Sequence, residues 1–418
     1  MTSKSTRFIK NRLSIIDVII GIIGKSNVGK STFFNAVTDL SVQTANYPFT
    51  TIEPNVGVAY VRIKCVCKEF EVQDNPVHSV CIDGVRFVPV KVIDIAGLVP
   101  GAHLGKGVGN KFLDDSRQAD GLIHVVDASG STDSEGRPVG PGTADPLYDI
   151  KFVEEEFDRW LCSIVGKEWN KFARESENKG QKIDVLLAKR LSGLAINDMQ
   201  ITRAIHQSNL DNKKPILWDE RDILNFSRIV RILSKPTIIA ANKIDISSTE
   251  TNITIMKEKG HDNIIPCAAE AEVVLRRAAK NKVLHYLPGD RSFEIRPNTN
   301  LNEQQIKALN TINVLFKKFG STGVQDVLNK LCFESLKLIA VFPVEDEFKL
   351  TDKKGNVLPD TYLLPEGSTP KDLAMKIHED LAKSFLYALN ARTKQRLGAE
   401  YVLKHRDVIK LVSTTSRR

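Results

Sequence analysis

The chain has 418 residues, 42% of them hydrophobic, which is enough apolar side chain to build the cores of two or three domains. Its formal net charge of +8 and isoelectric point of about 9.0 favour acidic partners such as RNA, although lysine-rich surfaces without such partners are equally common. The sequence lacks an apolar run of membrane-spanning length and a signal peptide, and its six cysteines are too sparse for a disulfide framework. We therefore expect a cytoplasmic protein, not associated with membranes, with free thiols, and favour a monomer.

Short apolar, β-branched runs recur along the chain and predict strands buried in a parallel sheet. They cover residues 15–23, 88–95, 122–126, 237–241 and 264–267. Most of them end in polar or glycine-rich segments, which is where an α/β sheet presents its ligand-binding loops. The pattern predicts a doubly wound α/β domain.

The stretch between Asp127 and Ala241 is too long for one crossover and has helical periodicity. We predict an inserted helical hairpin at 148–228, with the loop 129–146 as its entrance and the polar segment 174–181 as its tip. Its tryptophans, Trp160 and Trp169, are expected to pack helices.

The C-terminal segment 335–418 alternates strand-like runs with one helix. The runs are at 336–344, 361–364, 385–389, 401–402 and 408–411, and the helix begins with Thr369 as a cap, Pro370, and Asp372 in the position of a capping-box acid. This order predicts a β-grasp, ubiquitin-like domain. Residues 1–147 and 229–334, the latter with a helical extension, would form the α/β domain.

The segment after the first predicted strand fits the phosphate-binding loop (P-loop) pattern. Its glycines allow backbone N–H groups to surround phosphate oxygens at a helix N-terminus. Lys30 is predicted to be a catalytic residue that neutralises charge on the β- and γ-phosphates. The Ser31 hydroxyl is expected to bind Mg²⁺. The predicted contacts here are Gly24, Lys25, Ser26, Asn27, Val28, Gly29, Lys30, Ser31 and Thr32.

Two further segments are candidates for the magnesium and γ-phosphate site. Asp94 follows a predicted strand and is expected to hold Mg²⁺ through water, while the backbone N–H of Gly97 is expected to sense the γ-phosphate. Thr51, preferred to Thr50, would complete the magnesium shell. Taken alone, each segment also fits an ordinary polar loop.

Asn242, Lys243 and Asp245 follow another buried run and form the N-K-x-D pattern of a guanine site. The Asp245 carboxylate can accept hydrogen bonds from guanine N1–H and the 2-amino group, and adenine has neither donor. A backbone N–H within Cys267, Ala268 and Ala269 is expected to bind guanine O6. These residues predict GTP and GDP as ligands.

Together, these motifs resemble the Obg-related GTPases, and more narrowly the YchF or Obg-like ATPase subfamily. The resemblance rests on NYPFTTIEPN at 46–55, DIAGLVPGA at 94–102, GVGNKFL at 107–113 and the helical insertion. LPEGST at 364–369, with Asp372, is similar to the start of the subfamily's C-terminal TGS domain.

The resemblance carries several implications about catalysis. Leu98 stands where Ras-like proteins place the glutamine that orients water, so intrinsic turnover would be slow and another group would orient the water. His103 and Lys106 lie close by, and His103 is a candidate catalytic residue. The Asn27 position holds a potassium ion in some relatives; the alternative is that Asn27 only stabilises the loop.

The resemblance also bears on the nucleotide and the partner. The subfamily has ATP-preferring members that lost the guanine-reading aspartate, but this chain keeps Asp245, so we predict GTP, with ATP as the alternative. We expect a switch protein acting on the ribosome or RNA; the rival hypothesis is a ribosome-binding or RNA-binding scaffold with incidental hydrolysis. Basic residues near the C-terminus would form an RNA-facing surface or an ordinary solvated face: Arg392, Lys394, Arg396, Lys404 and Arg406.

Cys65, Cys67, His78 and Cys81 form a set that is able to hold zinc. Their spacing is poor, because a second Cys-x-x-Cys pair is missing. Ordinary buried thiols are the favoured interpretation.

Overall fold

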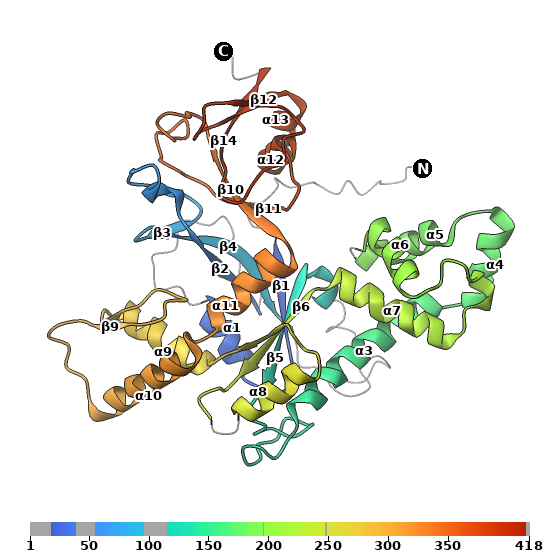
Figure 1. Ribbon diagram of the computed structural model, residues 1–418, viewed down its shortest axis with the longest axis horizontal. Helices are drawn as coiled ribbons and strands as arrows, with labels where there is room; N and C mark the ends of the chain where they lie inside the picture. The colour runs from blue at the N-terminus through green and yellow to red at the C-terminus, as the bar shows by residue number, and fades with distance from the viewer. Residues whose placement is uncertain (1–17, 39–54, 96–114, 195, 247–248, 415–418) are drawn as a thin grey trace, which may run out of the picture.

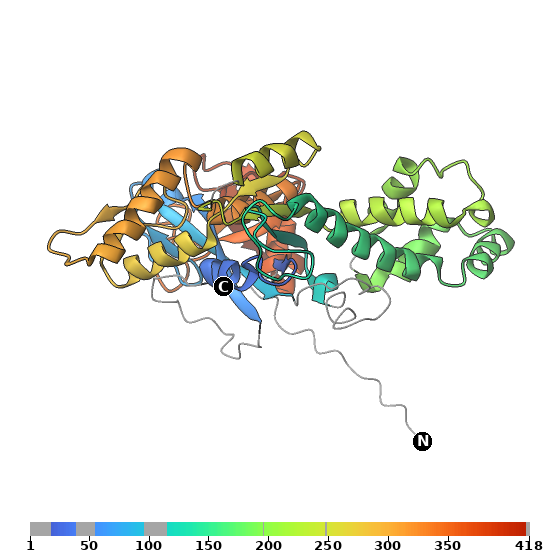
Figure 2. The same ribbon diagram turned by 90° about the horizontal axis from the view of Figure 1, so that it is seen from below.

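The computed structural model of the protein describes residues 18–38, 55–95, 115–194, 196–246 and 249–414. Figure 1 shows a central sheet with helices around it, an arm of helices on one side and a second β-domain at the C-terminal end. Figure 2 shows that the arm extends well away from the sheet. In the described part of the chain, no helix is long and apolar enough to cross a bilayer.

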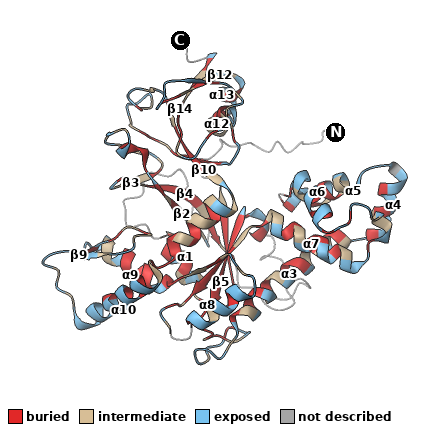
Figure 3. Ribbon diagram, viewed as in Figure 1, coloured by how far each residue is buried: buried red, intermediate tan, exposed pale blue. Residues whose placement is uncertain are grey.

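The central sheet has the order β2-β4-β1-β5-β6-β7, with β3 paired to β4. The strands β4, β1, β5, β6 and β7 run parallel, whereas β2 and β3 are antiparallel to β4. Figure 3 shows the sheet centre buried, as expected for apolar strands covered on both faces. The bounds are β1 Ile19–Ile23, β2 Val56–Lys64, β3 Val80–Ile82, β4 Val85–Asp94, β5 Gly121–Asp127, β6 Thr237–Asn242 and β7 Ile264–Pro266.

Helices lie on both faces of this sheet, which confirms the predicted doubly wound fold. α1 (Lys30–Thr38) and α11 (Val324–Asn329) cover one face together with a π-helical continuation, Lys330–Ser335. α3 (Pro146–Gly166) and α8 (Thr249–Glu258) contact the other face. The remaining elements beside the sheet are α9 Ala269–Lys280, β8 Leu284–His285, β9 Glu294–Ile295, α10 Glu303–Phe319 and the 3₁₀ helix Val66–Lys68.

The insertion between β5 and β6 is helical, as predicted, but is larger than a hairpin. α3 and α7 (Glu220–Ser234) run side by side, and α4 (Trp169–Lys179), α5 (Ile183–Leu191) and α6 (Asp198–Gln207) form its far end. Short 3₁₀ helices, Ser192–Leu194 and Pro215–Leu217, join them. The predicted tip lies largely within α4, whose last turn ends at Gly180 with φ +60°.

Aromatic packing holds this arm together, as predicted for Trp160 and Trp169. Trp169 and Trp218 stack with ring centroids 5.2 Å apart, and Trp160 packs edge-on against Phe157 at 5.4 Å. Each indole N–H of the stacked pair donates to a backbone carbonyl, so burial leaves neither donor without a partner. This core would not form from two helices alone.

The C-terminal domain is a five-stranded sheet of order β11-β10-β14-β12-β13. β10 and β14 are parallel, and the other pairs are antiparallel. The predicted cap is confirmed, because Thr369 and Asp372 form a capping box at the start of α12. The bounds are β10 Leu338–Val344, β11 Tyr362–Pro365, α12 Pro370–Ile377, α13 Glu379–Lys383, β12 Phe385–Asn390, β13 Arg396–Leu397 and β14 Val408–Ser413.

One predicted strand of this domain is wrong. Tyr401 and Val402 lie in irregular backbone, and the edge strand that pairs with β12 is Arg396–Leu397. Tyr401 N–H bonds locally to Gly398 O, and Leu403 N–H bonds to Ser368 O, so this segment anchors to the loop before α12.

Candidate functional site

The P-loop lies between the carboxyl end of β1 and the start of α1. Gly24 has φ +150°, and a Cβ there would lie 2.5 Å from Val125 O; Gly29 has φ +91°, and its Cβ would lie 2.3 Å from Asn242 Nδ2. Only glycine fits such contacts and dihedrals without strain. The glycines thus let the loop pass closely over β5 and β6, with the N-terminus of α1 following directly.

Lys30, the first residue of α1, pairs with Asp94 at the end of β4. Lys30 Nζ lies 3.0 Å from Asp94 Oδ1, and each side chain is 14% exposed. The parallel register of β1 and β4, which aligns Ile22 with Asp94, brings the two motifs together. Ser31, the next residue of α1, is exposed. A cation at the start of α1 and a carboxylate at the end of β4 therefore meet beside the P-loop.

Asn242, the last residue of β6, joins the predicted base site to the P-loop. Its Nδ2 donates to Val28 O at 3.0 Å, and its Oδ1 accepts from Ala269 N at 3.0 Å. Asn242 is buried, whereas Asp245 is exposed. The N-K-x-D segment and the Cys-Ala-Ala segment thus meet beside the P-loop.

Comparison with known proteins agrees with this arrangement. Residues 19–146 match a family described as 50S ribosome-binding GTPase, residues 240–346 the YGR210-like Obg-like GTPase G4 motif-containing domain, and residues 349–413 the TGS domain. The uncharacterized GTP-binding protein MJ1332 of Methanocaldococcus jannaschii is 50% identical, over 94% of this chain and 99% of that protein. The chain belongs to the YchF-type, Obg-related P-loop GTPases.

A solved structure and a second relative also resemble this YchF-type protein. A crystal structure of a GTP binding protein from Pyrococcus horikoshii covers 95% of this chain and all of its own, with 40% identity and a TM-score of 0.75. The ribosome-binding ATPase YchF of Mycoplasma genitalium is 36% identical over 49% of this chain and 57% of that protein. The YchF-type chain is accordingly a P-loop nucleoside triphosphatase with a C-terminal TGS domain.

The Cys-Ala-Ala segment of this YchF-type protein already uses its backbone donors. Cys267 N–H bonds to Ala241 O at 2.7 Å and Ala268 N–H to Thr322 O at 2.9 Å, while Ala269 bonds to Asn242. A guanine O6 atom would have to share or displace one of these bonds. The expectation of a backbone donor here therefore stays a prediction.

Sequence reasoning missed Asp127, the last residue of β5. Its carboxylate accepts from Lys243 Nζ at 2.8 Å, Ser129 Oγ at 2.5 Å, Ser131 Oγ at 2.8 Å and Thr132 Oγ1 at 2.9 Å. Burial raises the pKa of Asp127, but these bonds, with that of Lys243 the largest, hold the pKa below its ordinary value. Asp127 fixes the Lys243 side chain, and the only signal in the sequence was its place at a strand end.

A second missed contact links the P-loop to the helical arm. Lys25 Nζ lies 2.8 Å from the Asp149 carboxylate on α3 and also donates to Thr132 O at 3.0 Å and Asp133 O at 2.7 Å. Asn27 Nδ2 donates to Gly136 O at 2.8 Å. The loop 129–146 therefore packs on the P-loop, and these contacts support the structural alternative for Asn27. The Lys25 side chain points to α3, so Lys25 would reach a nucleotide through its backbone.

Several predicted residues lie outside the described part of the chain. They are Thr50, Thr51, Gly97, Leu98, His103 and Lys106.

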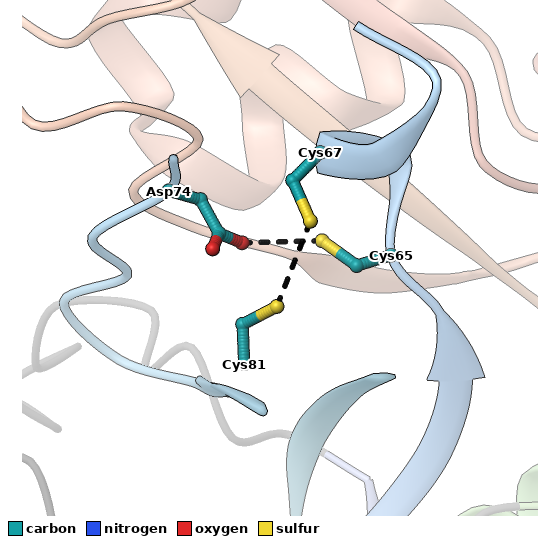
Figure 4. A group of neighbouring side chains, drawn as sticks. All are labelled: Cys65, Cys67, Asp74 and Cys81. Atoms are coloured by element: carbon teal, nitrogen blue, oxygen red, sulfur yellow. Dashed lines mark hydrogen bonds between the residues drawn. The ribbon is translucent and has the colours of Figure 1, made fainter. Parts of the chain in front are cut away.

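The cysteine and histidine set that the sequence offered as an alternative zinc site differs in one member from the cluster in the structure. His78 Nδ1 lies 2.7 Å from Asp360 Oδ1 in the C-terminal part, away from the thiols. Asp74 joins Cys65, Cys67 and Cys81 instead (Figure 4).

Two of the basic residues expected to face RNA have another role. Arg392 and Arg406 both pair with Glu69, which follows the 3₁₀ helix after β2. They hold the TGS domain against the nucleotide-binding domain. Lys394, Arg396 and Lys404 are exposed, although Arg396 lies over the Tyr387 ring.

Proposed function

We propose that this protein is a magnesium-dependent GTP-binding and GTP-hydrolysing switch. The observation that carries the proposal is Asn242, which is hydrogen-bonded to the P-loop and to the segment after β7. Asp245 follows Asn242 by three residues and is exposed, and we expect it to face the base when the phosphates occupy the P-loop. A carboxylate there pairs with guanine N1–H and the 2-amino group and leaves adenine without a matching donor.

The donor set beside the P-loop fits a magnesium ion. Mg²⁺ prefers oxygen ligands and keeps several waters, and the Ser31 hydroxyl and the Asp94 carboxylate supply one direct and one water-mediated partner. When bound, the ion would offset the negative charge that develops on the phosphates. We expect Lys30 to exchange Asp94 for the β- and γ-phosphates, which frees the carboxylate. Thr51, Gly97 and His103 are further proposed members of this site.

The same loop raises the question whether Asn27 binds a potassium ion. Asn27 Nδ2 is engaged by Gly136 O, which supports a structural part for Asn27 rather than a cation site. If potassium acts here, hydrolysis by the wild type will be faster in potassium than in sodium salts, and Asn27→Ala will lose that difference. Equal rates in the two salts leave Mg²⁺ as the only cofactor.

We propose the ribosome or its RNA as the partner, bound by a monomer in the cytoplasm. The support is the family description and the relative's name quoted above, together with the exposed Lys394 and Lys404 on the TGS domain. A scaffold with incidental hydrolysis is the rival. A switch must bind its partner with different affinity in its GTP and GDP states, whereas a scaffold has no such requirement.

The base site is tested by equilibrium binding of GTP, GDP, XTP and ATP with Mg²⁺. Wild type should prefer GTP to ATP, and Asp245→Asn should bind GTP at least about tenfold more weakly, because its amide offers a donor where guanine also has donors. The same amide should improve binding of XTP, which carries a carbonyl at that position. Glu250→Gln, an exposed change on α8, is the matched control. ATP binding by wild type equal to or tighter than GTP binding would make the ATPase alternative the correct one.

The partner proposal needs a separate measurement. Affinity for purified ribosomes is compared with GDP and with a non-hydrolysable GTP analogue. A difference of about tenfold or more would show that nucleotide controls binding, and equal affinities would favour the scaffold. Lys30→Ala serves as the hydrolysis control, since full turnover in that variant would sink the assignment of the P-loop.

A further inference from the structure

Three cysteines and one aspartate converge in the excursion between β2 and β4, outside the nucleotide site. Cys65 and Cys67 flank the start of the 3₁₀ helix after β2, Asp74 lies in the following loop, and Cys81 is on β3. Figure 4 shows the three sulfurs and one carboxylate oxygen pointing toward a common centre. The ligand atoms of all four residues lie within 4.8 Å of one another.

Two separations within the cluster are close to the edges of a tetrahedron around one metal ion. Cys67 Sγ lies 3.8 Å from Cys81 Sγ, and Cys65 Sγ lies 3.2 Å from Asp74 Oδ2. With Zn–S bonds of about 2.3 Å and Zn–O bonds of about 2.1 Å, tetrahedral geometry requires about 3.8 Å between sulfurs and about 3.6 Å between sulfur and oxygen. Small adjustments of the Asp74 side chain would therefore complete the site.

The burial and charge of these four side chains also suit a metal ion. Cys65 is fully buried and the Asp74 side chain is only 6% exposed, so a carboxylate is placed among thiols away from water. Arg86 pairs with this carboxylate at 2.8 Å and offsets its charge, and a divalent cation would in addition bind the three sulfurs as thiolates. The donor set of three sulfurs and one oxygen is one that zinc accepts, and calcium and magnesium do not prefer sulfur.

The fully buried Arg86 supplies the surrounding shell that metal sites require. Its Nη2 donates to Asp74 Oδ2 at 2.8 Å and lies 3.6 Å from Cys65 Sγ, while Nη1 donates to Ser79 Oγ at 2.7 Å. Three thiolates and a carboxylate carry four negative charges. With a Zn²⁺ ion bound, the net charge of the site would be −2, and the positive charge of Arg86 would reduce it to −1. The same guanidinium fixes the orientation of two ligands.

We propose that Cys65, Cys67, Asp74 and Cys81 bind one Zn²⁺ ion in a structural site. Four protein ligands leave no open position for a substrate or water, which is the arrangement of a structural rather than a catalytic zinc. Residues 72–79, which carry Asp74, form neither a helix nor a strand. The ion would therefore hold this loop in its fold.

The loop held by the ion is also the one that contacts the C-terminal part of the chain. Val77 N–H donates to Pro359 O at 2.8 Å, Asn75 N–H to Val357 O at 3.1 Å, and Arg86 Nη2 to Leu358 O at 3.0 Å. Zinc would thus stabilise the interface between this loop and the C-terminal part of the chain as well as the loop itself.

The first experiment measures metal in the full chain purified under reducing conditions from zinc-supplemented cells. Elemental analysis should give about one zinc per chain for wild type and for Cys162→Ser, a thiol on α3 outside the cluster, and much less for Cys81→Ser. Asp74→Asn, which keeps the shape of the side chain, should retain three ligands and bind zinc at least about tenfold more weakly. Wild type without bound zinc under these conditions would overturn the proposal.

A second experiment avoids dependence on variants that fail to fold. Wild-type apo-protein is titrated with Co²⁺ alone, which absorbs strongly in the visible when thiolates bind it tetrahedrally, and then with Zn²⁺. Saturation near one equivalent, bleaching by Zn²⁺ and protection of three thiols from a thiol reagent would support the site. Absence of the cobalt spectrum, or an intact-mass loss of two hydrogens from a Cys67–Cys81 disulfide in wild type as isolated, would refute it.

Discussion

At the scale of the residue, His124 has an unusual environment. It lies on β5 in the middle of the sheet, 2% exposed, and its Nε2 has no hydrogen-bond partner among the described residues. Burial, followed by the positive charges of Arg231 and His261, lowers the pKa of His124 to about 3. The side chain is therefore neutral in the folded protein over the physiological range.

The low pKa of His124 predicts that acid destabilises the folded protein. Because the unfolded chain binds this proton near pH 6.5 and the folded chain only near pH 3, the free energy of unfolding should fall as pH decreases from about 6.5. Between pH 7 and pH 5 the loss from this residue is about 2 kcal/mol. His124→Leu should remove it, measured by urea unfolding followed by circular dichroism at both pH values.

The control for His124 is His206→Gln, since the His206 side chain is 81% exposed. That variant should keep the wild-type pH dependence. If His124→Leu also loses stability in parallel with wild type, another group carries the effect.

At the scale of the element, a buried ion pair joins the P-loop to α3. Burial raises the pKa of Asp149 to about 6 while Lys25 opposes the shift, so the carboxyl is ionised at neutral pH and the ion pair is complete. Asp145 caps α3 by accepting from Leu147 N–H, and Pro146 follows at the first position. The helix start thus places Asp149 under the P-loop.

Breaking this pair from one side should be costly. Lys25→Met leaves a buried carboxylate without its cation and should reduce the free energy of unfolding by about 3–5 kcal/mol. Lys25→Met combined with Asp149→Leu should recover most of that loss, because it leaves neither charge buried. Urea unfolding of the two single variants and the double variant gives the coupling energy.

An exposed pair on the same helix provides the comparison. Lys151 and Glu155 are 77% and 50% exposed, and Lys151→Met should change stability by less than about 1 kcal/mol. Additive effects of Lys25→Met and Asp149→Leu would mean that the two side chains are not coupled.

At the scale of the whole molecule, one apolar core runs from the central sheet into the TGS domain. Phe342 and Val344 of β10 and Val408 of β14 pack in the same cluster as Cys65 and Val66. Glu69, bound by Arg392 and Arg406, lies at the edge of this contact. Burial alone would raise the pKa of Glu69, but the two arginines lower it below its ordinary value. Apolar packing therefore carries the docking, and the charges add orientation.

This division predicts a small and salt-dependent effect of Glu69. Glu69→Gln should lower the free energy of unfolding by no more than about 1 kcal/mol at low salt, and the difference from wild type should vanish at high salt. Thermal unfolding at two salt concentrations measures it. Glu379→Gln, which removes an exposed pair with Lys383, is the control. A large loss that persists at high salt would contradict a mainly apolar interface.

The sequence itself determined the features that local spacing encodes. The P-loop pattern, the parallel strands and the Thr369 and Asp372 capping box were predicted because each depends on neighbours a few residues away, and the order of elements predicted the β-grasp domain. Periodicity also revealed a helical insertion, but it did not give five helices, because the Trp169 and Trp218 contact that organises them joins residues far apart in the chain.

Tertiary structure alone decided which distant side chains meet. Lys25 with Asp149, Lys243 with Asp127, and Arg392 with Glu69 are separated by more than a hundred residues, so nothing in local spacing pairs them. Likewise, Asp74 rather than His78 joins the three cysteines, because the loop turns His78 toward Asp360. Local patterns specify elements and nucleotide motifs, whereas the packing of elements selects the partners of each buried charge, since a buried charge must find compensation wherever the fold supplies it.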